Sequence, residues 1–336
     1  MNVSNSVKKK FSYLLMVLSI MCFALVGCSG DTAEKSEVTP TAPVEATATP
    51  EATKTSETTE SKGFEVTIID STQTEVKLTQ EPMKIVSLAP STTEIIAAIG
   101  AGDKLVGRTS FCNYPESITA LPEVGGTMDP SVEAIVALEP DLVVGAGHAP
   151  EEVVTKLREV GIQVAFLKED ENFEGTYSTI EKLGLLTGKD EEAKKVIDEM
   201  KAKVEKVDTD IKALNLEQIP KVYYATGYGD GDWGAGGDTY IGEIINLAGA
   251  TNIMQDISGW EISKEQIAEA DPDIIIVPSG SGAVEAMKTT EFYKDLRAVK
   301  EGKVFEVNGD TISRQGPRVA DALVEMAQKI HPEIVK

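Results

Sequence analysis

The chain has 336 residues, of which 32 are lysine or arginine and 55 are aspartate or glutamate, giving a formal net charge of −23. A surface this acidic repels phosphate groups, which argues against nucleic acid as a partner and against adsorption to anionic lipid. Only two histidines and three cysteines are present, so we expect neither a multi-histidine metal site nor a framework of disulfides.

The N-terminus has the pattern of a bacterial lipoprotein signal. Lysines at residues 8–10 precede an uncharged, almost wholly apolar stretch, residues 11–24. That stretch is shorter than the roughly 20 residues of a membrane-spanning helix. Small residues then precede Cys28, whose thiol can be acylated before the chain is cut. We predict a signal peptide over residues 1–27 and a lipid on Cys28; the alternative is an uncleaved signal anchor.

Residues 28–62 differ in composition from everything that follows. They are rich in Thr, Glu, Ala, Pro and Ser and contain no aromatic residue. Such a segment cannot bury enough apolar surface to offset the entropy of ordering the chain. We therefore expect a disordered tether that holds a folded part, beginning at residue 63, to the outer face of the bacterial cytoplasmic membrane. The lipid would be its sole contact with the membrane.

The folded part repeats itself. Residues 94–101 and 243–250 match in register, and each reads as an amphipathic helix that ends at a glycine in the left-handed conformation. Residues 131–144 and 263–276 form a second pair, in which a serine N-cap and a first-turn glutamate begin a helix. A proline-aspartate pair ends that helix before an apolar strand. Because both pairs occur in the same order, we infer a duplicated unit.

Helices and strands alternate in both copies. The expected strands are short continuous apolar runs, such as residues 84–88, 142–144 and 274–277. Runs of this kind are typical of parallel strands that helices cover on both faces. We therefore predict an α/β fold with two similar lobes and mainly parallel sheets.

A long helix is expected between the two copies. Residues 190–214 place apolar side chains at steps of three and four, which gives one apolar face. We predict that this single rigid helix joins an N-terminal lobe, residues 63–189, to a C-terminal lobe, residues 215–336. The alternative is an ordinary surface helix of one domain.

Several segments resemble a known family. They are residues 84–94, residues 135–143 and Gly-Pro-Arg at 316–318, and they are similar to segments of the class III solute-binding proteins of ABC importers. Within that class, Ala-Pro-Ser-x-Thr-Glu at 89–94 and Asn-Tyr-Pro at 113–115 resemble the cobalamin-binding proteins most closely. The resemblance covers nearly all of the folded part. It implies a ligand in the cleft between two lobes and delivery to a dimeric permease with its ATPase subunits.

Glu133 and Glu265 occupy equivalent positions in the two copies. A protein with pseudo-two-fold symmetry would present them as a pair, and a two-fold permease could offer a basic residue to each. The resemblance assigns both glutamates to permease docking. Each also lies in the first turn of a predicted helix, where a carboxylate stabilises the helix by roughly 0.3–1 kcal/mol, and the two roles are compatible.

The ligand is expected beyond the carboxyl ends of the strands, as in other open α/β sheets. By resemblance, Phe111 replaces a ligand-facing tyrosine, and Asp310 with Arg314 matches a polar pair that holds the edge of a corrinoid. Thr127 and Ala146 depart from the family pattern, which leaves the corrinoid assignment open. The predicted substrate-binding residues are Ser91, Phe111, Tyr114, Met128, His148, Tyr228, Trp233, Trp260, Asp310 and Arg314.

The predicted function is capture of a cobalt corrinoid, without catalysis, cofactor or metal held by the protein itself. A ferric siderophore or haem is the alternative ligand. His148 could coordinate its metal, although a loop histidine more often makes ordinary hydrogen bonds, and anionic siderophores would favour more arginines than Arg108 and Arg314 in the cleft. An extracytoplasmic enzyme is the alternative class, but the chain lacks a G-x-S-x-G motif and His148 is its only candidate histidine base.

Overall fold

The structure is a computed structural model that describes residues 63–168, 170–229 and 231–334. These residues belong to one compact unit. The predicted signal peptide, Cys28 and the predicted tether lie outside the described residues. Within the described ranges, no helix combines the length and the apolar character that crossing a membrane requires.

The first sheet is parallel throughout, with four strands in the order β4-β3-β5-β6, and the antiparallel hairpin β1-β2 precedes it in the chain. Its strands and those of the hairpin are β1 (Val66–Ile69), β2 (Glu75–Leu78), β3 (Ile85–Ser87), β4 (Leu105–Arg108), β5 (Leu142–Gly145) and β6 (Val164–Phe166). The helices around it are α1 (Pro90–Ala98), η1 (Gly102–Lys104), η2 (Glu116–Ala120), α2 (Val132–Ala137), α3 (Glu151–Glu159) and α4 (Phe173–Thr187).

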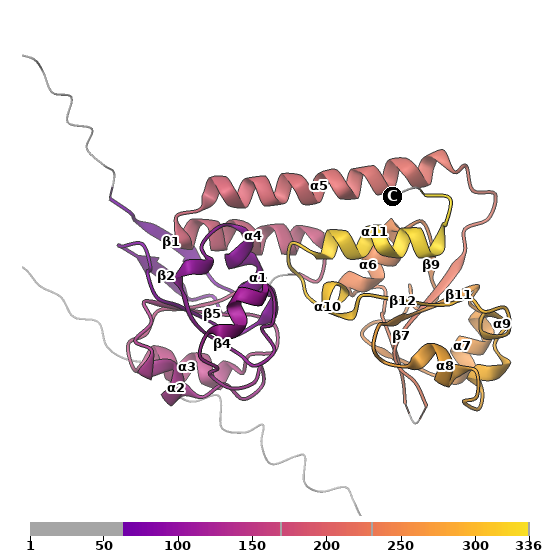
Figure 1. The fold of residues 1–336 in the computed structure, drawn as a ribbon, viewed down its shortest axis with the longest axis horizontal. Helices are drawn as coiled ribbons and strands as arrows, with labels where there is room; N and C mark the ends of the chain where they lie inside the picture. The colour runs from indigo at the N-terminus through magenta and orange to yellow at the C-terminus, as the bar shows by residue number, and fades with distance from the viewer. Residues whose placement is uncertain (1–62, 169, 230, 335–336) are drawn as a thin grey trace, which may run out of the picture. The chain divides into compact units, whose positions relative to one another are not determined.

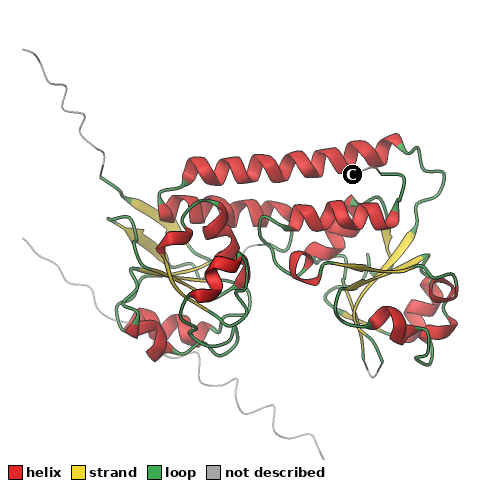
Figure 2. Cartoon of the chain, viewed as in Figure 1, coloured by secondary structure: helices red, strands yellow, loops and turns green. Residues whose placement is uncertain are grey.

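The second sheet has six strands in the order β10-β8-β7-β11-β12, with β9 beside β7. Strands β7, β9, β11 and β12 are parallel, whereas β8 pairs antiparallel with both β7 and β10. Figure 2 shows the strands of both sheets with helices around them. The strands are β7 (Lys221–Gly227), β8 (Asp232–Gly234), β9 (Thr251–Asn252), β10 (Glu261–Ile262), β11 (Ile274–Pro278) and β12 (Val304–Val307). The helices are α6 (Tyr240–Leu247), α7 (Lys264–Ala270), α8 (Ala283–Met287), η3 (Tyr293–Asp295), α9 (Arg297–Lys300), α10 (Gly309–Ile312) and α11 (Val319–Ile330). The predicted fold class is confirmed.

The long helix expected between the sheets is α5 (Asp190–Ala213). It packs against α4 and α11, which lie one after the other along its length in Figure 1. Its fully buried residues, Ala193, Ile197, Met200 and Val207, follow the apolar face seen in the sequence. Because this face contacts a helix from each half of the chain, α5 links the two halves through packing as well as through the backbone.

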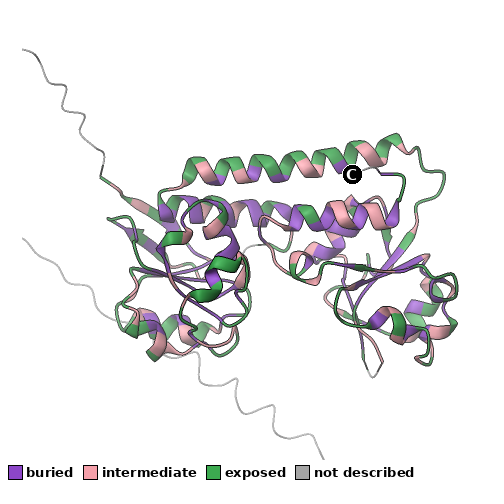
Figure 3. Ribbon diagram, in the orientation of Figure 1, coloured by how far each residue is buried: buried purple, intermediate pink, exposed green. Residues whose placement is uncertain are grey.

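Successive side chains along each strand enter different hydrophobic cores on the two faces of a sheet. One core joins a face of both sheets to α4, α5, α6 and α11. A second core lies between the other face of the second sheet and α7, α8 and α9, and a third lies between the other face of the first sheet and α2 and α3. Tyr223 and Tyr224, neighbours in β7, therefore enter different cores, and Figure 3 shows the strands buried while much of α5 is exposed. The shared core holds both sheets to one helical layer.

The duplicated signals produce matching local structures. Gly100 and Gly249 follow α1 and α6 with φ angles of 77° and 75°, the left-handed conformation expected after a helix. The side chain of Ser131 caps α2, and Ser263 caps α7 in a capping box with Gln266. These agreements confirm the helix ends that were predicted for both copies.

Asp70 connects the β1-β2 hairpin to the first sheet. Its side chain is inaccessible to solvent and forms an ion pair with Arg158. It also accepts hydrogen bonds from the backbone N–H groups of Thr72 at 2.9 Å, Thr74 at 3.1 Å and Phe166 at 3.0 Å. Burial acts to raise the pKa of Asp70, but the hydrogen bonds from Thr72, Phe166 and Thr74 outweigh it and leave the pKa below its ordinary value.

We expect Asp70→Ala to lower the free energy of unfolding by about 3 kcal/mol, because it leaves Arg158 and three N–H groups without their acceptor. Denaturant unfolding measures this, and Asp103→Ala, which removes an exposed carboxylate, should cost less than about 0.5 kcal/mol. The folded-state pKa of Asp70 is depressed, so its stabilisation is present above the unfolded value of about 3.9 and is lost as the pH falls through the folded value. Equal losses in the two variants would contradict this role.

Candidate ligand-binding cleft

A cleft of about 530 Å³ lies where the carboxyl ends of the first sheet face the second half of the chain. Its lining includes the segments that follow β3, β5 and β6, with Phe111 from the loop after β4. The second half contributes Tyr240, Trp260 and residues near the end of α10. This volume is within the range of about 300–1,000 Å³ for small-molecule sites. The cleft therefore occurs where the topology of the sheets predicts a ligand.

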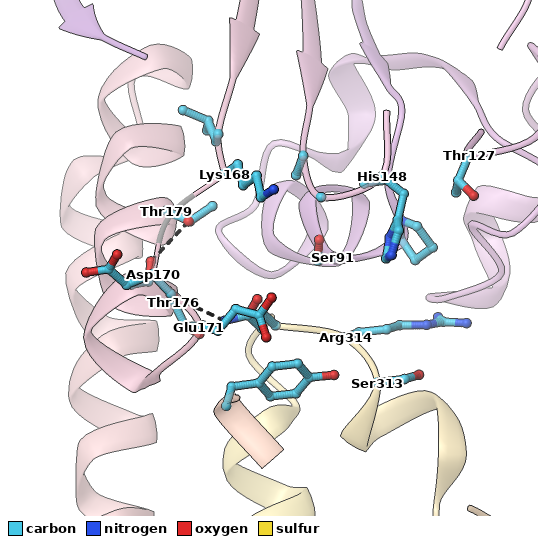
Figure 4. Close-up of a pocket in the computed structure, with 18 of the residues that line it drawn as sticks. Ser91, Thr127, His148, Lys168, Asp170, Glu171, Thr176, Thr179, Ser313 and Arg314 are labelled. Carbon is cyan, nitrogen blue, oxygen red and sulfur yellow. Dashed lines mark hydrogen bonds between the residues drawn. The ribbon is translucent and has the colours of Figure 1, made fainter. Parts of the chain in front are cut away.

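Most of the predicted substrate-binding residues line this cleft. They are Ser91, Phe111, His148, Trp260, Asp310 and Arg314. In Figure 4, Ser91 and His148 come from the first half of the chain, and Arg314 comes from the second. Thr127 and Ala146, which depart from the family pattern, line the cleft as well. The structure thus brings these residues together, while their contact with a ligand stays a prediction.

The other predicted residues lie outside the cleft lining. The ring of Tyr114 lies 3.9 Å from the guanidinium carbon of Arg318. Met128 is 65% exposed. Tyr228 packs edge-on against Tyr293, with ring centroids 5.7 Å apart.

Trp233 lies on β8 rather than in an open loop. Its side chain covers the backbone of the hairpin, where an added Cβ on Gly227 or Gly231 would lie 3.0 or 3.1 Å from the indole ring. The residue remains 44% exposed. Its neighbour Asp232 is buried and binds Tyr293 and Lys264. These contacts fix the hairpin to the second core instead of directing Trp233 into the cleft.

Sequence reasoning missed part of the cleft. Lys168, Asp170 and Glu171 follow β6, and Figure 4 shows them beside Thr176 of α4. The rule that placed the other loops at the carboxyl ends of strands applies equally to β6, and would have found this segment.

Tyr240 at the start of α6 also lines the cleft. Burial, followed by the nearby Tyr224 and Glu171, raises the pKa of Tyr240. Its phenol therefore stays protonated at neutral pH and can donate a hydrogen bond.

Arg314 uses three of its five N–H donors within the protein. Its Nη1 donates to Oε1 of Glu94 at 2.7 Å and to Oδ1 of Asn113 at 2.8 Å, and its Nη2 donates to Oδ1 of Asp310 at 2.9 Å. The Asp310–Arg314 pair expected from the sequence therefore forms. In Figure 4 the Arg314 side chain extends away from Asp170 and Glu171. The guanidinium is a bound part of the cleft wall, and its side chain is 10% exposed.

Glu133 and Glu265 lie at the same position of equivalent helices, the second residue of α2 and of α7. Both are exposed. A backbone hydrogen bond at the helix start and a second from Ser131 lower the pKa of Glu133. Neither glutamate lines the cleft. Their placement fits a surface contact that is separate from ligand binding.

Two α/β lobes with a cleft at the carboxyl ends of their strands and a shared helical layer define a solute-binding protein. The chain belongs to the periplasmic binding protein family, whose model matches residues 85–311. This is a family of solute-binding proteins and not of enzymes.

Comparison with known proteins narrows the class of solute-binding protein to which the chain belongs. It is 31% identical to an uncharacterized ABC transporter substrate-binding lipoprotein, YvrC, of Bacillus subtilis, over 81% of this chain and 88% of that one. A cobalamin-binding protein of Halobacterium salinarum is 28% identical over 88% of this chain and 82% of its own length. The crystal structure of a periplasmic heme binding protein from Pseudomonas aeruginosa superposes with a TM-score of 0.69 at 26% identity, covering 76% of this chain and 94% of that chain. The chain is thus a substrate-binding protein of an ABC transporter.

Proposed function

We propose that this protein captures a corrinoid, cobalamin, in the cleft and delivers it to a dimeric permease. The observation that carries the proposal is the composition of the cleft. Aromatic side chains from both halves of the chain, Phe111, Tyr240 and Trp260, line it together with hydroxyl and carboxylate groups. A corrinoid offers a flat, largely apolar ring edged with amides, which suits aromatic walls and hydrogen-bond acceptors. The naming of relatives as cobalamin-binding proteins supports the same ligand.

Haem or a ferric siderophore is the second candidate ligand, because His148 lines the cleft and imidazole can coordinate iron. Both ligands usually carry carboxylates or other anionic groups. The cleft lining contains three carboxylates, Asp170, Glu171 and Asp310, against one lysine, Lys168, and its arginine is already bound to Glu94. These charges favour an amide-bearing ligand over an anionic one.

Binding without catalysis is part of the proposal. A hydrolase on this scaffold would need a nucleophile joined to a base. Ser91 and His148 both line the cleft, yet in the part of the chain that the structure describes no hydrogen bond joins their side chains. The lipid on Cys28 is likewise proposed from the sequence, and the lipoprotein of Bacillus subtilis supports it. Such an anchor would keep the receptor close to its permease and raise their effective concentration.

Calorimetry of the processed, lipid-free protein tests the ligand. Cyanocobalamin, cobinamide, haem and a ferric hydroxamate would be titrated under the same conditions. We expect tight binding of the corrinoids and weaker binding of the iron chelates. Tight binding of haem or of the hydroxamate, without binding of either corrinoid, would reject cobalamin as the ligand.

A further inference from the structure

Three segments that carry the family resemblance meet in the structure. Glu94 comes from the segment 89–94, Asn113 and Tyr114 come from the segment 113–115, and Arg318 comes from the segment 316–318. Arg314 lines the cleft and binds Glu94 and Asn113 from two of these segments. The side chain of Glu94 is 2% exposed.

Glu94 binds two arginines at once. Its Oε1 accepts from Nη1 of Arg314 at 2.7 Å and from Nη2 of Arg318 at 2.6 Å, and its Oε2 accepts from Nε of Arg318 at 2.7 Å. The ring of Tyr114 covers the guanidinium of Arg318. Asp310 takes a further donor of Arg314. Two carboxylates therefore compensate two guanidinium groups at the wall of the cleft.

We propose that Glu94 is a positioning residue that sets the ligand specificity of the cleft. By binding Arg314, Glu94 keeps the cleft from presenting a guanidinium whose positive charge is uncompensated. This inference rests on the proposed corrinoid function. It adds how the cleft would prefer a ligand with neutral amide groups to a ligand with carboxylates.

The chemistry of guanidinium explains the effect. A free arginine binds carboxylates in a bidentate geometry that an amide cannot match in strength. Without this compensation the cleft would contain such a group in a lining that also includes Trp260 and His148. With Glu94 in place, the donors of Arg314 point to Glu94, Asn113 and Asp310. A ligand carboxylate at this wall meets the carboxylate of Asp310 and an arginine whose charge is already compensated by Glu94, and it is disfavoured.

A matched pair of ligands tests the inference. Cyanocobalamin and a derivative with one side-chain amide hydrolysed to a carboxylate differ by a single negative charge. We expect the wild-type protein to bind cyanocobalamin about tenfold more tightly than the carboxylate. Glu94→Gln adds one net positive charge to the cleft wall and should remove most of that difference. The double variant Glu94→Gln with Arg314→Gln restores the charge balance and should restore the preference for the amide.

A purely structural role for Glu94 would lower both affinities together and leave their ratio unchanged. That result would overturn the inference while leaving cobalamin as the ligand. A wild-type protein that binds neither corrinoid would reject the proposed function and this inference with it. Should Glu94→Gln fail to fold, Arg314→Gln carries the test, because it removes one positive charge and should widen the preference for the amide. An unchanged ratio in that variant would also overturn the inference.

Discussion

Reversing the charges of Glu133 and Glu265 together, with Glu133→Lys and Glu265→Lys, should reduce ligand uptake by about a hundredfold and leave ligand binding unchanged. Each exposed carboxylate would meet a basic residue of one permease subunit, and the lysine turns that attraction into repulsion. Like charges placed opposite each other at an interface cost several kcal/mol. Transport assays in cells that depend on this importer, beside calorimetry of the purified variant, measure the two quantities.

The single reversals should have intermediate effects, because each removes one half of a symmetric contact. The control is Glu199→Lys with Glu205→Lys, which makes the same change of net charge on exposed positions of α5. That variant should transport normally. Loss of the first-turn carboxylates costs α2 and α7 up to about 1 kcal/mol each through the helix dipole, so thermal unfolding must accompany the assay. A parallel fall in binding and in uptake would show that the glutamates do not serve docking.

The fold could be predicted because its signals are local and occur twice. Gly100 and Gly249 end helices in the left-handed conformation. Glycine adopts this conformation at little cost, so a glycine after an amphipathic run predicts a helix end. Ser131 and Ser263 cap helices for a similarly local reason, the reach of a hydroxyl to an N–H group three residues on. The apolar runs are strands buried on both faces, as their composition indicated.

The residues of the cleft could be predicted only where they directly follow a parallel strand, because the end of the strand determines their position. Ser91, which follows β3, and His148, which follows β5, lie in it because parallel strands end at one edge of a sheet. Trp233 was predicted to contact the ligand but lies outside the cleft lining. It lies in β8, an antiparallel strand paired with β7 and β10, and not in a segment at the carboxyl end of a parallel strand. Its position depends on Asp232 binding Tyr293, a contact between residues 61 positions apart.

Contacts between distant segments limited the prediction further. The family resemblance implied the pairing of Asp310 with Arg314, which lie four positions apart in one segment. The bond from Arg314 to Glu94 spans 220 positions, and no periodicity or cap indicates it. The sequence therefore identified a polar pair at the cleft, and the structure shows that a third residue compensates its arginine.

The two tryptophans provide the sharpest test of the cleft, since the sequence predicted ligand contact for both and the structure separates them. Trp260→Ala should weaken binding of cyanocobalamin by about 30-fold, because a large aromatic wall contributes about 2 kcal/mol or more when a ligand covers it. Trp233→Ala should leave the affinity unchanged, since its side chain lies on the hairpin outside the cleft. Calorimetry of the two variants gives this comparison directly.

Fluorescence of the same variants provides a second and independent readout. With Trp233 replaced, the remaining emission comes from Trp260, and a bound corrinoid should quench it strongly because the ring lies against the indole. With Trp260 replaced, Trp233 should be quenched much less at the same occupancy. Trp260 also packs against the core that the two sheets share, so both variants must be compared at equal folded fraction by thermal unfolding. Equal losses of affinity, or stronger quenching of Trp233 than of Trp260, would place the ligand on the β7-β8 hairpin instead of in the cleft.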